Sequence, residues 1–318
     1  MRFPFHPCVA FRSRVSPVLL TLVLLPLSAA CSQPAPPPAE MDTDRMLQHV
    51  EVLSSDAYEG RKTGTPAAER TRAYLVGVLE ETGAVPCSDD GAWEHPAVAA
   101  RRDNQPIVNV LAQVPGTSGS DIRMVVSAHY DHLGIRDGEI YNGADDNASG
   151  TAAVLELARY FAAHPPEHTI VFALFDFEEG GLNGARAFVE SPCGSGTIAL
   201  NVNLDMVSRS EAGELYASGT RHWPSVRPLL EMVAVPEGVT LLYGHDEPGT
   251  GSDDWTMSSD HGPFHAAGIP FVYFGVEDHD GYHRPSDDFD QITPEFYRSV
   301  GVFLSRAIRT LNTGLGQL

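Results

Sequence analysis

The chain has 318 residues, and no linker-like shift of composition occurs after about residue 41, so we expect one large domain behind a short N-terminal segment. It carries 42 acidic against 21 basic residues, a formal net charge of −21 at pH 7. So acidic a surface argues against nucleic acid and anionic membranes as binding partners. The oligomeric state stays open.

The first 30 residues have the layout of a secretory signal. They hold three arginines and no acidic residue, then an apolar stretch at 18–27, then Ser28-Ala29-Ala30. That stretch is too short to span a bilayer. The prediction is a signal peptide at residues 1–30, a Pro-rich tether at 31–41 and a catalytic domain at 42–318. The protein is then exported from a bacterial cytoplasm, to be periplasmic, anchored in the outer membrane or secreted.

Cys31 directly follows the signal, and two fates compete for it. Leu27-Ser28-Ala29-Ala30-Cys31 resembles the lipobox of bacterial lipoproteins, although Ser28 stands where leucine is usual. Lipid attachment to Cys31 is favoured over simple cleavage after Ala30, because the Pro-rich segment 34–38 looks like a spacer between an anchor and a fold. Contact with a membrane is expected only through such an anchor.

Two further cysteines, Cys87 and Cys193, belong to the predicted domain. In an oxidising compartment they could pair, or both could stay free, since the sequence gives no distance between them. No cluster of cysteines predicts a thiolate metal site.

Helices and strands alternate along the predicted domain. Helix-type apolar spacing occurs at 44–54, 66–81, 148–163, 182–190, 225–235 and 294–311. Short apolar or β-branched runs predict strands at 107–114, 122–128, 169–175, 197–204, 239–243 and 271–274. This alternation indicates an α/β fold, as a single-domain three-layer α/β/α arrangement around a central mixed, mostly parallel sheet, with ligands bound at strand ends.

Imidazoles and carboxylates stand where these strands and helices begin or end. His129 and Asp131 close one strand, where side chains two apart point the same way, so the Asp131 carboxylate can orient the His129 imidazole. Asp145 lies in the segment 143–150, just before a helix. Helix capping needs one polar residue there, but three are present, so Asp145 is a candidate bridge between two cations.

Glu178 and Glu179 follow a very apolar strand and precede a tight glycine-rich turn. Of two adjacent glutamates, one can bind a metal and the other can carry a proton. An apolar environment raises the pKa of the proton carrier toward neutrality. Asp205 ends another strand, and His283 lies near the C-terminus. Two imidazoles and three carboxylates suffice to hold a pair of divalent cations.

With Glu59-Gly60-Arg61, Gly64-Thr65 and Ser259-Asp260-His261, these pieces resemble the zinc aminopeptidases of metallopeptidase family 28 over residues 53–311. The resemblance implies a zinc-dependent exopeptidase fold and two zinc ions per chain. It also implies peptide substrates, whose N-terminal bond is hydrolysed to release a free amino acid.

The resemblance also implies roles for single residues. It implies five zinc ligands, with His129 and Asp205 on one ion, Glu179 and His283 on the other, and Asp145 bridging both. Glu178 is then the general base, which takes a proton from the attacking water and returns it to the leaving amine, and Asp131 supports His129. A cis peptide bond is expected between Asp145 and Asp146. Supporting or substrate-contacting roles are left for Asp260, His261 and Tyr282.

Alternatives remain on the same fold. A glutaminyl cyclase with one zinc is disfavoured, because Asp146 and Asn147 follow the peptidase pattern. A non-catalytic binding domain has no need of a full ligand set and a base. A carboxypeptidase or dipeptidase stays open, since specificity depends on pocket residues that the sequence does not locate. Candidates for that pocket are Tyr216, Trp223, Tyr243, Trp255 and Phe264.

Overall fold

The computed structural model describes residues 4, 40–99 and 104–318, and one compact unit spans Ala39–Leu318. The predicted signal peptide, Cys31 and nearly all of the predicted tether lie outside the described residues. Export of the protein and lipidation of Cys31 therefore stay predictions.

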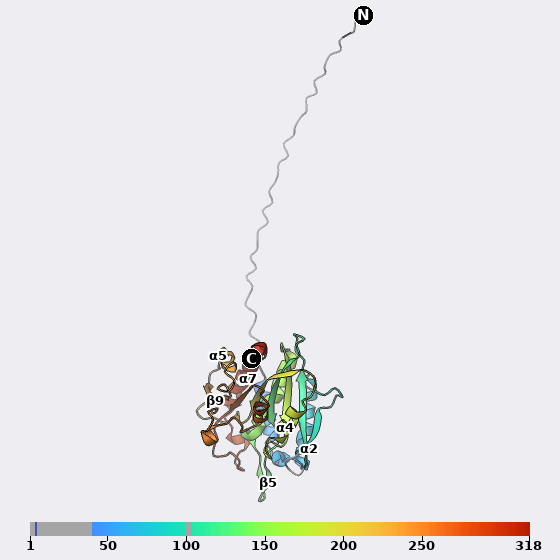
Figure 1. Cartoon of the computed structure of the whole chain (residues 1–318). Helices are drawn as coiled ribbons and strands as arrows, with labels where there is room; N and C mark the ends of the chain where they lie inside the picture. The colour runs from blue at the N-terminus through green and yellow to red at the C-terminus, as the bar shows by residue number, and fades with distance from the viewer. Residues whose placement is uncertain (1–3, 5–39, 100–103) are drawn as a thin grey trace. The chain divides into compact units, whose positions relative to one another are not determined.

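A nine-stranded mixed sheet forms the centre of the unit (Figure 1), with the order β1-β3-β7-β4-β8-β11-β9-β10 and with β2 also paired to β3. The four central strands β7, β4, β8 and β11 are parallel, and β3 joins them antiparallel. The strands of this sheet are β1 (Val85–Pro86), β2 (Glu94–Ala99), β3 (Gln105–Val114), β4 (Ile122–His129), β7 (Thr169–Phe175), β8 (Thr197–Leu204), β9 (Glu214–Ser218), β10 (Thr240–Tyr243) and β11 (Phe271–Gly275). A separate hairpin pairs β5 (Gly134–Arg136) with β6 (Glu139–Tyr141).

Helices cover both faces of the sheet, which confirms the three-layer prediction. They are α1 (Thr43–Leu53), α2 (Pro66–Glu80), α3 (Gly150–Ala163), α4 (Asn183–Glu190), α5 (Val226–Glu231), α6 (His261–Ala266) and α7 (Pro294–Gly314). Short helical turns are η1 (Asp56–Arg61), η2 (Ala144–Ser149), η3 (Gly251–Asp253), η4 (Phe289–Gln291) and η5 (Leu315–Gln317).

Alternation along the central strands divides the core in two. On β4, Met124 and Val126 face a large cluster built with α1, α3, α5 and α7, whereas Val125 faces a smaller cluster built with α4 and α6. On β7, Phe172 and Val171 divide in the same way. This is the period of two of a strand buried on both faces.

The predicted strands and helices are all present, with differences at their ends. α5 ends at Glu231, four residues before the predicted end, and the chain turns through Pro236 and Gly238 before β10. Six elements were not predicted from the sequence because they are short or, in β2, contain Pro96: α6 and the strands β1, β2, β5, β6 and β9.

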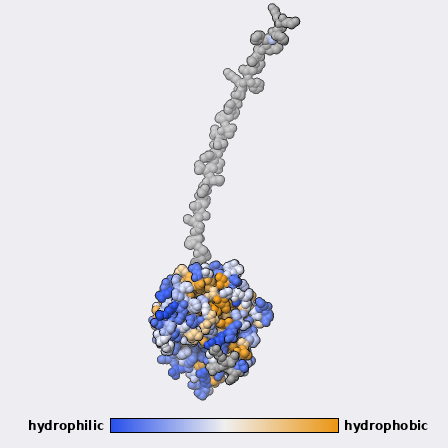
Figure 2. All heavy atoms as spheres, viewed as in Figure 1, coloured by the Kyte–Doolittle hydropathy of each residue, from blue (hydrophilic) through white to orange (hydrophobic). Residues whose placement is uncertain are grey.

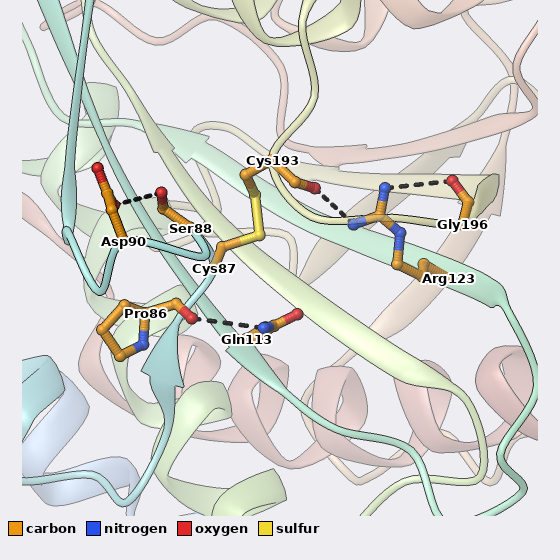
Figure 3. The surroundings of a disulfide bond; sticks show 8 residues. All are labelled: Pro86, Cys87, Ser88, Asp90, Gln113, Arg123, Cys193 and Gly196. Carbon is orange, nitrogen blue, oxygen red and sulfur yellow. Dashed lines mark hydrogen bonds between the residues drawn. A yellow bond between two sulfur atoms is a disulfide. The ribbon is translucent and has the colours of Figure 1, made fainter.

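Cys87 and Cys193 form a disulfide, which answers the question that the sequence left open (Figure 3). It joins the residue after β1 to the loop between α4 and β8, across 106 positions of the chain. The buried Arg123 donates hydrogen bonds to the carbonyl oxygens of Cys193 and Gly196, at 2.6 and 3.3 Å, and so ties the same loop to β4.

Hydrophilic residues cover most of the face of this unit that Figure 2 displays, as the acidic composition suggests, and apolar residues gather in one band. Within the described ranges, no helix combines the length and the apolar character needed to cross a bilayer.

The disulfide predicts a measurable stability difference. The double variant Cys87→Ser/Cys193→Ser should lose about 2–5 kcal/mol of unfolding free energy, because a closed loop of this length restricts the unfolded chain. Urea unfolding of the two proteins measures it. A reductant should lower the wild-type midpoint and leave the variant unchanged. Equal midpoints for both proteins under oxidising conditions would contradict the prediction.

Candidate metal centre

A cleft of about 510 Å³ opens at the carboxyl ends of the parallel strands. β4 ends in His129, β7 leads into Glu178 and Glu179, and β8 leads into Asp205. The loop after β11 adds His283. Because neighbouring parallel strands end at one edge of the sheet, residues far apart in sequence converge there.

His129, Asp146 and Asp205 form the first group of candidate ligands, and all three are buried. The His129 Nε2 atom lies 3.3 Å from a carboxylate oxygen of Asp146 and 3.3 Å from one of Asp205. Burial lowers the pKa of His129, but the carboxylates of Asp205 and Glu178 outweigh burial and raise it well above its ordinary value. An imidazole facing two carboxylates is an arrangement that a cation satisfies.

A second group lies around the other oxygen of Asp146. The Nε2 atom of His283 is 3.2 Å from Asp146 Oδ2 and 3.4 Å from Glu179 Oε2. The Nδ1 atom of His132 is 2.8 Å from Glu179 Oε1 and 3.7 Å from Asp146 Oδ2. Burial raises the pKa of Asp146, but the three imidazoles outweigh it and hold that pKa well below its ordinary value. Asp146 is therefore common to both groups.

This arrangement corrects the expectation that Asp145 is the bridging carboxylate. Asp145 Oδ1 accepts hydrogen bonds from the backbone N–H and the hydroxyl of Ser208, at 2.8 and 2.7 Å, and Oδ2 lies 3.2 Å from His279 Nε2. The two neighbouring aspartates have different partners, and only Asp146 belongs to the two groups. The cis peptide bond also lies one residue later than expected, between Asp146 and Asn147.

Asp287 fixes the backbone of this turn. Its two carboxylate oxygens accept hydrogen bonds from the backbone N–H groups of Asp145 and Asp146, both at 3.0 Å. Asn147 Nδ2 donates to the carbonyl oxygen of Leu204 at 2.9 Å, which ties the turn to the end of β8. Hydrogen bonds thus fix the turn before and after the Asp146 side chain.

The fully buried Arg61 stabilises the same region through hydrogen bonds. Its guanidinium donates to the carbonyl oxygens of Leu53, Tyr130, Asn142 and Gly143, at 2.6–2.9 Å. These contacts connect the segment after α1 both to the end of β4 and to the residues that precede Asp146.

Asp131 does not orient His129 through its carboxylate in the way that the sequence led us to expect. His129 Nδ1 lies 3.1 Å from the backbone carbonyl oxygen of Asp131, whereas the nearest carboxylate oxygen is 3.8 Å away. The carboxylate instead accepts a hydrogen bond from the backbone N–H of Glu178 at 3.0 Å. Asp131 thus orients His129 through its backbone and Glu178 through its side chain.

Glu178 lines the cleft but belongs to neither ligand group. Burial raises the pKa of its carboxyl well above the ordinary value, and the charges of Asp205 and Asp260 raise it further against the opposing effect of His129. A carboxyl with a raised pKa beside the ligand groups is suited to take up and release a proton.

The other three candidate residues differ in position. Asp260 and His261 are fully buried and do not line the cleft. Burial raises the pKa of Asp260 to about 7, and burial lowers that of His261 to about 4, so the imidazole is neutral as it packs on Phe271. Tyr282 lines the cleft and stacks on His283 with ring centroids 4.0 Å apart.

Among the five aromatic candidates, only Trp255 lines the cleft within the described chain. Phe264 belongs to the smaller core cluster, and Trp223 and Tyr243 pack against the larger one. Tyr216 packs edge-on against Trp255 at 5.5 Å.

Three residues of this region were not predicted from the sequence: His132, Asp146 as the shared carboxylate, and Asp287. All three lie within four residues of residues that were predicted. Only their position could have indicated them, since His132 directly follows Asp131 and Asp287 belongs to the acidic stretch after His283.

The donors fit a pair of zinc ions. Within each of two groups, His129–Asp146–Asp205 and His132–Asp146–Glu179, the ligand atoms lie within 4.8 Å of one another, and the groups share Asp146. Zinc in proteins takes histidine and carboxylate ligands of this kind. Both groups border the cleft, so a substrate could reach them.

A model of peptidase family M28 matches residues 109–308. Aminopeptidase YwaD of Bacillus subtilis is 29% identical over 264 residues, covering 78% of this chain and 52% of that protein. A Zn-dependent exopeptidase from Parabacteroides distasonis has a TM-score of 0.66 at 18% identity, over 86% of this chain and 99% of that one. A glutaminyl cyclase of Porphyromonas gingivalis has a TM-score of 0.68 at 21% identity, over 85% and 99%.

The chain spans about half the length of the first curated relatives it matches, 52% and 48%. The two solved structures establish the fold alone, since a peptidase and a cyclase resemble this chain about equally. The family match extends from β3 to α7 and includes every residue of the two ligand groups and Glu178. On that match the chain belongs to peptidase family M28.

Proposed function

We propose that the protein is a co-catalytic two-zinc aminopeptidase, which hydrolyses the N-terminal bond of peptides. The observation that carries this proposal is the sharing of Asp146 by two imidazole–carboxylate groups beside Glu178. One zinc would take His129, Asp146 and Asp205, and the other Asp146, Glu179 and His283.

Two bound zinc ions would supply Lewis acidity toward the scissile carbonyl and acidify water in the cleft. Glu178 would take the proton of the attacking water and return it to the leaving amine. The Asp131 carboxylate fixes the backbone N–H of Glu178 at 3.0 Å, so the base is oriented before substrate enters.

The charge of the cleft supports an aminopeptidase over a carboxypeptidase or dipeptidase. No lysine or arginine is among the described residues that line it, so no cationic side chain is available for a substrate carboxylate. Asp278 lines the cleft, is exposed, and has no salt bridge within the described part of the chain. Its free carboxylate would attract the α-ammonium group of a peptide.

A glutaminyl cyclase with one zinc is the alternative, and the shared fold does not separate the two activities. The presence of both ligand groups favours the peptidase. The Cys87–Cys193 disulfide supports export to an oxidising compartment, since such bonds are rare in the cytosol. We propose that residues 1–30 direct this export and that Cys31 carries a lipid.

Zinc titration of the metal-stripped protein, from residue 32 onward, tests the two-zinc proposal. Release of arylamine from a leucyl arylamide should rise to a plateau at two zinc ions per chain. Binding that saturates at one zinc, with no release at any zinc concentration, would instead favour a cyclase or a peptidase that does not recognise a free amino terminus.

The two adjacent glutamates should separate binding from turnover. Glu178→Gln should keep both zinc ions and lower kcat by about 100–10,000-fold, the usual contribution of a general base. Glu179→Ala should lose one zinc ion. Metal analysis and steady-state kinetics measure both effects, with the exposed Glu51→Gln as a control that should change neither. Full activity of Glu178→Gln would refute the assignment of the base.

Asp278→Asn tests the recognition of the amino terminus. KM for the leucyl arylamide should rise about 2–5-fold with kcat nearly unchanged, since an exposed ion pair contributes up to about 1 kcal/mol. Asp280→Asn, on the same loop but outside the cleft, is the matched control. An unchanged KM in Asp278→Asn would exclude this role.

A further inference from the structure

The Trp255 indole lines the cleft, and the imidazole of His245 is stacked on one of its faces. The ring centroids lie 3.6 Å apart and the ring planes are inclined by only 7°. Tyr216 on β9 meets both rings edge-on, with its centroid 4.5 Å from that of His245 and 5.5 Å from that of Trp255. His245 is not among the described residues that line the cleft, so it lies behind one of the cleft walls.

Backbone hydrogen bonds join the same two residues. The Trp255 N–H donates to the carbonyl oxygen of His245 at 2.7 Å, and the Ser218 hydroxyl donates to that oxygen at 3.0 Å. The next residue, the buried Asp246, accepts hydrogen bonds from two backbone N–H groups that follow β9, at 3.0 and 2.9 Å. The backbone of His245 is thus fixed by contacts that its side chain does not make.

Carboxylates flank the imidazole at both ring nitrogens. Nδ1 lies 2.9 Å from Asp253 Oδ1, and Nε2 lies 3.1 Å from Glu277 Oε1. Glu277 directly precedes Asp278, so His245 contacts both the segment that carries Trp255 and the loop after β11. Both carboxylates are exposed, and ion pairs of exposed groups contribute little. We therefore expect the stacking on Trp255 to outweigh the ion pairs.

We propose that His245 is a positioning residue of the cleft, whose stacked imidazole holds the Trp255 indole in place as an apolar wall for the substrate. This proposal rests on the peptidase activity proposed above, because it assigns the wall to a bound peptide. Without the imidazole, the indole would lose the packing on one face and would be free to turn away from the cleft. The protein would then bind the apolar part of a substrate more weakly, while the groups around Glu178 stay unchanged.

The variant His245→Asn tests this role. Asparagine tolerates the φ of +53° at this position and carries no ring. KM for the leucyl arylamide should rise about 2–10-fold, the contribution of one aromatic pair, with kcat nearly unchanged. The control His164→Asn, at a histidine that packs on Tyr160 away from the cleft, should leave KM as it is. An unchanged KM in His245→Asn would overturn the proposal.

A double-variant cycle with Trp255→Leu separates positioning from a general loss of stability. If His245 acts through the indole, its removal has no effect once the indole is gone. His245→Asn/Trp255→Leu should therefore have the KM of Trp255→Leu alone. Effects that multiply would show that the two residues act independently, and they would refute the positioning role.

The flanking carboxylates offer a competing explanation, in which ion pairs rather than stacking hold the two loops together. Asp253→Asn/Glu277→Gln removes both carboxylates and leaves the imidazole in place. KM should then change by less than about 2-fold, since exposed ion pairs are weak. A rise as large as that of His245→Asn would assign the role to the ion pairs and contradict the stacking.

Quenching of Trp255 fluorescence tests the same contact without activity or bound metal. In the background Trp93→Phe/Trp223→Phe, Trp255 is the one remaining tryptophan of the three in the chain. The acrylamide quenching constant should rise in His245→Asn, because one face of the indole loses its cover. An equal constant would overturn the role of His245, whatever the zinc titration shows. A higher constant in a protein that hydrolyses no arylamide would support the contact and count against the aminopeptidase proposal alone. The kinetic cycle needs no such background, so a background that fails to fold leaves the test intact.

Discussion

The contacts of the buried Arg61 guanidinium are the constraint on which the geometry of the site depends. One side chain donates to four carbonyl oxygens from three separate segments. Burial lowers the pKa of Arg61 to about 10, against the opposing charges of Asp146, Asp287, Asp131 and Glu179, so it stays protonated at neutral pH. Its charge offsets part of the repulsion among those carboxylates, and its hydrogen bonds fix the backbone from which two of them project. A lysine could not replace it, because one ammonium group lacks the planar fork that reaches several acceptors.

The sheet supplies the second constraint. Alternating side chains of β4 and β7 are packed between two layers of helices, so a slip of either strand by one residue would move its side chains to the wrong face. On β8, the even-numbered residues Leu200, Val202 and Leu204 join the larger core cluster, while Asn201 and Asn203 form a buried hydrogen-bond network with Ser127 and Ser259. The polar face of β8 ends at Asp205. The strand ends thus hold His129 and Asp205, whereas the other candidate ligands and Glu178 lie in the turns and loops that follow the strands.

Apolar periodicity was sufficient to predict the central strands and the long helices, because each buries a continuous apolar face. It failed for short strands such as β2 and β9, whose formation depends on the strands they pair with rather than on their own composition. Four of the five predicted ligands line the cleft, and Asp146 lines it in place of Asp145. Asp145 and Asp146 are chemically identical, and the choice between them is made by Ser208, His279 and Asp287, all distant in sequence. His132 was missed because nothing in the sequence shows that it lies buried beside Glu179.

The candidate ligands extend from His129 at the end of β4 to His283 beyond β11, so no short peptide from this chain contains a complete group. An unfolded chain therefore has little affinity for zinc at these positions, and the ion-binding site exists only after the sheet has formed. Loading with metal is consequently a late event, which follows folding and takes place in whatever compartment the folded chain occupies. Once loaded, ions that bind only the native state shift the folding equilibrium by mass action, by about 2.7 kcal/mol for one ion at a hundred times its Kd. The metal supply of that compartment would then contribute to the stability of the folded protein.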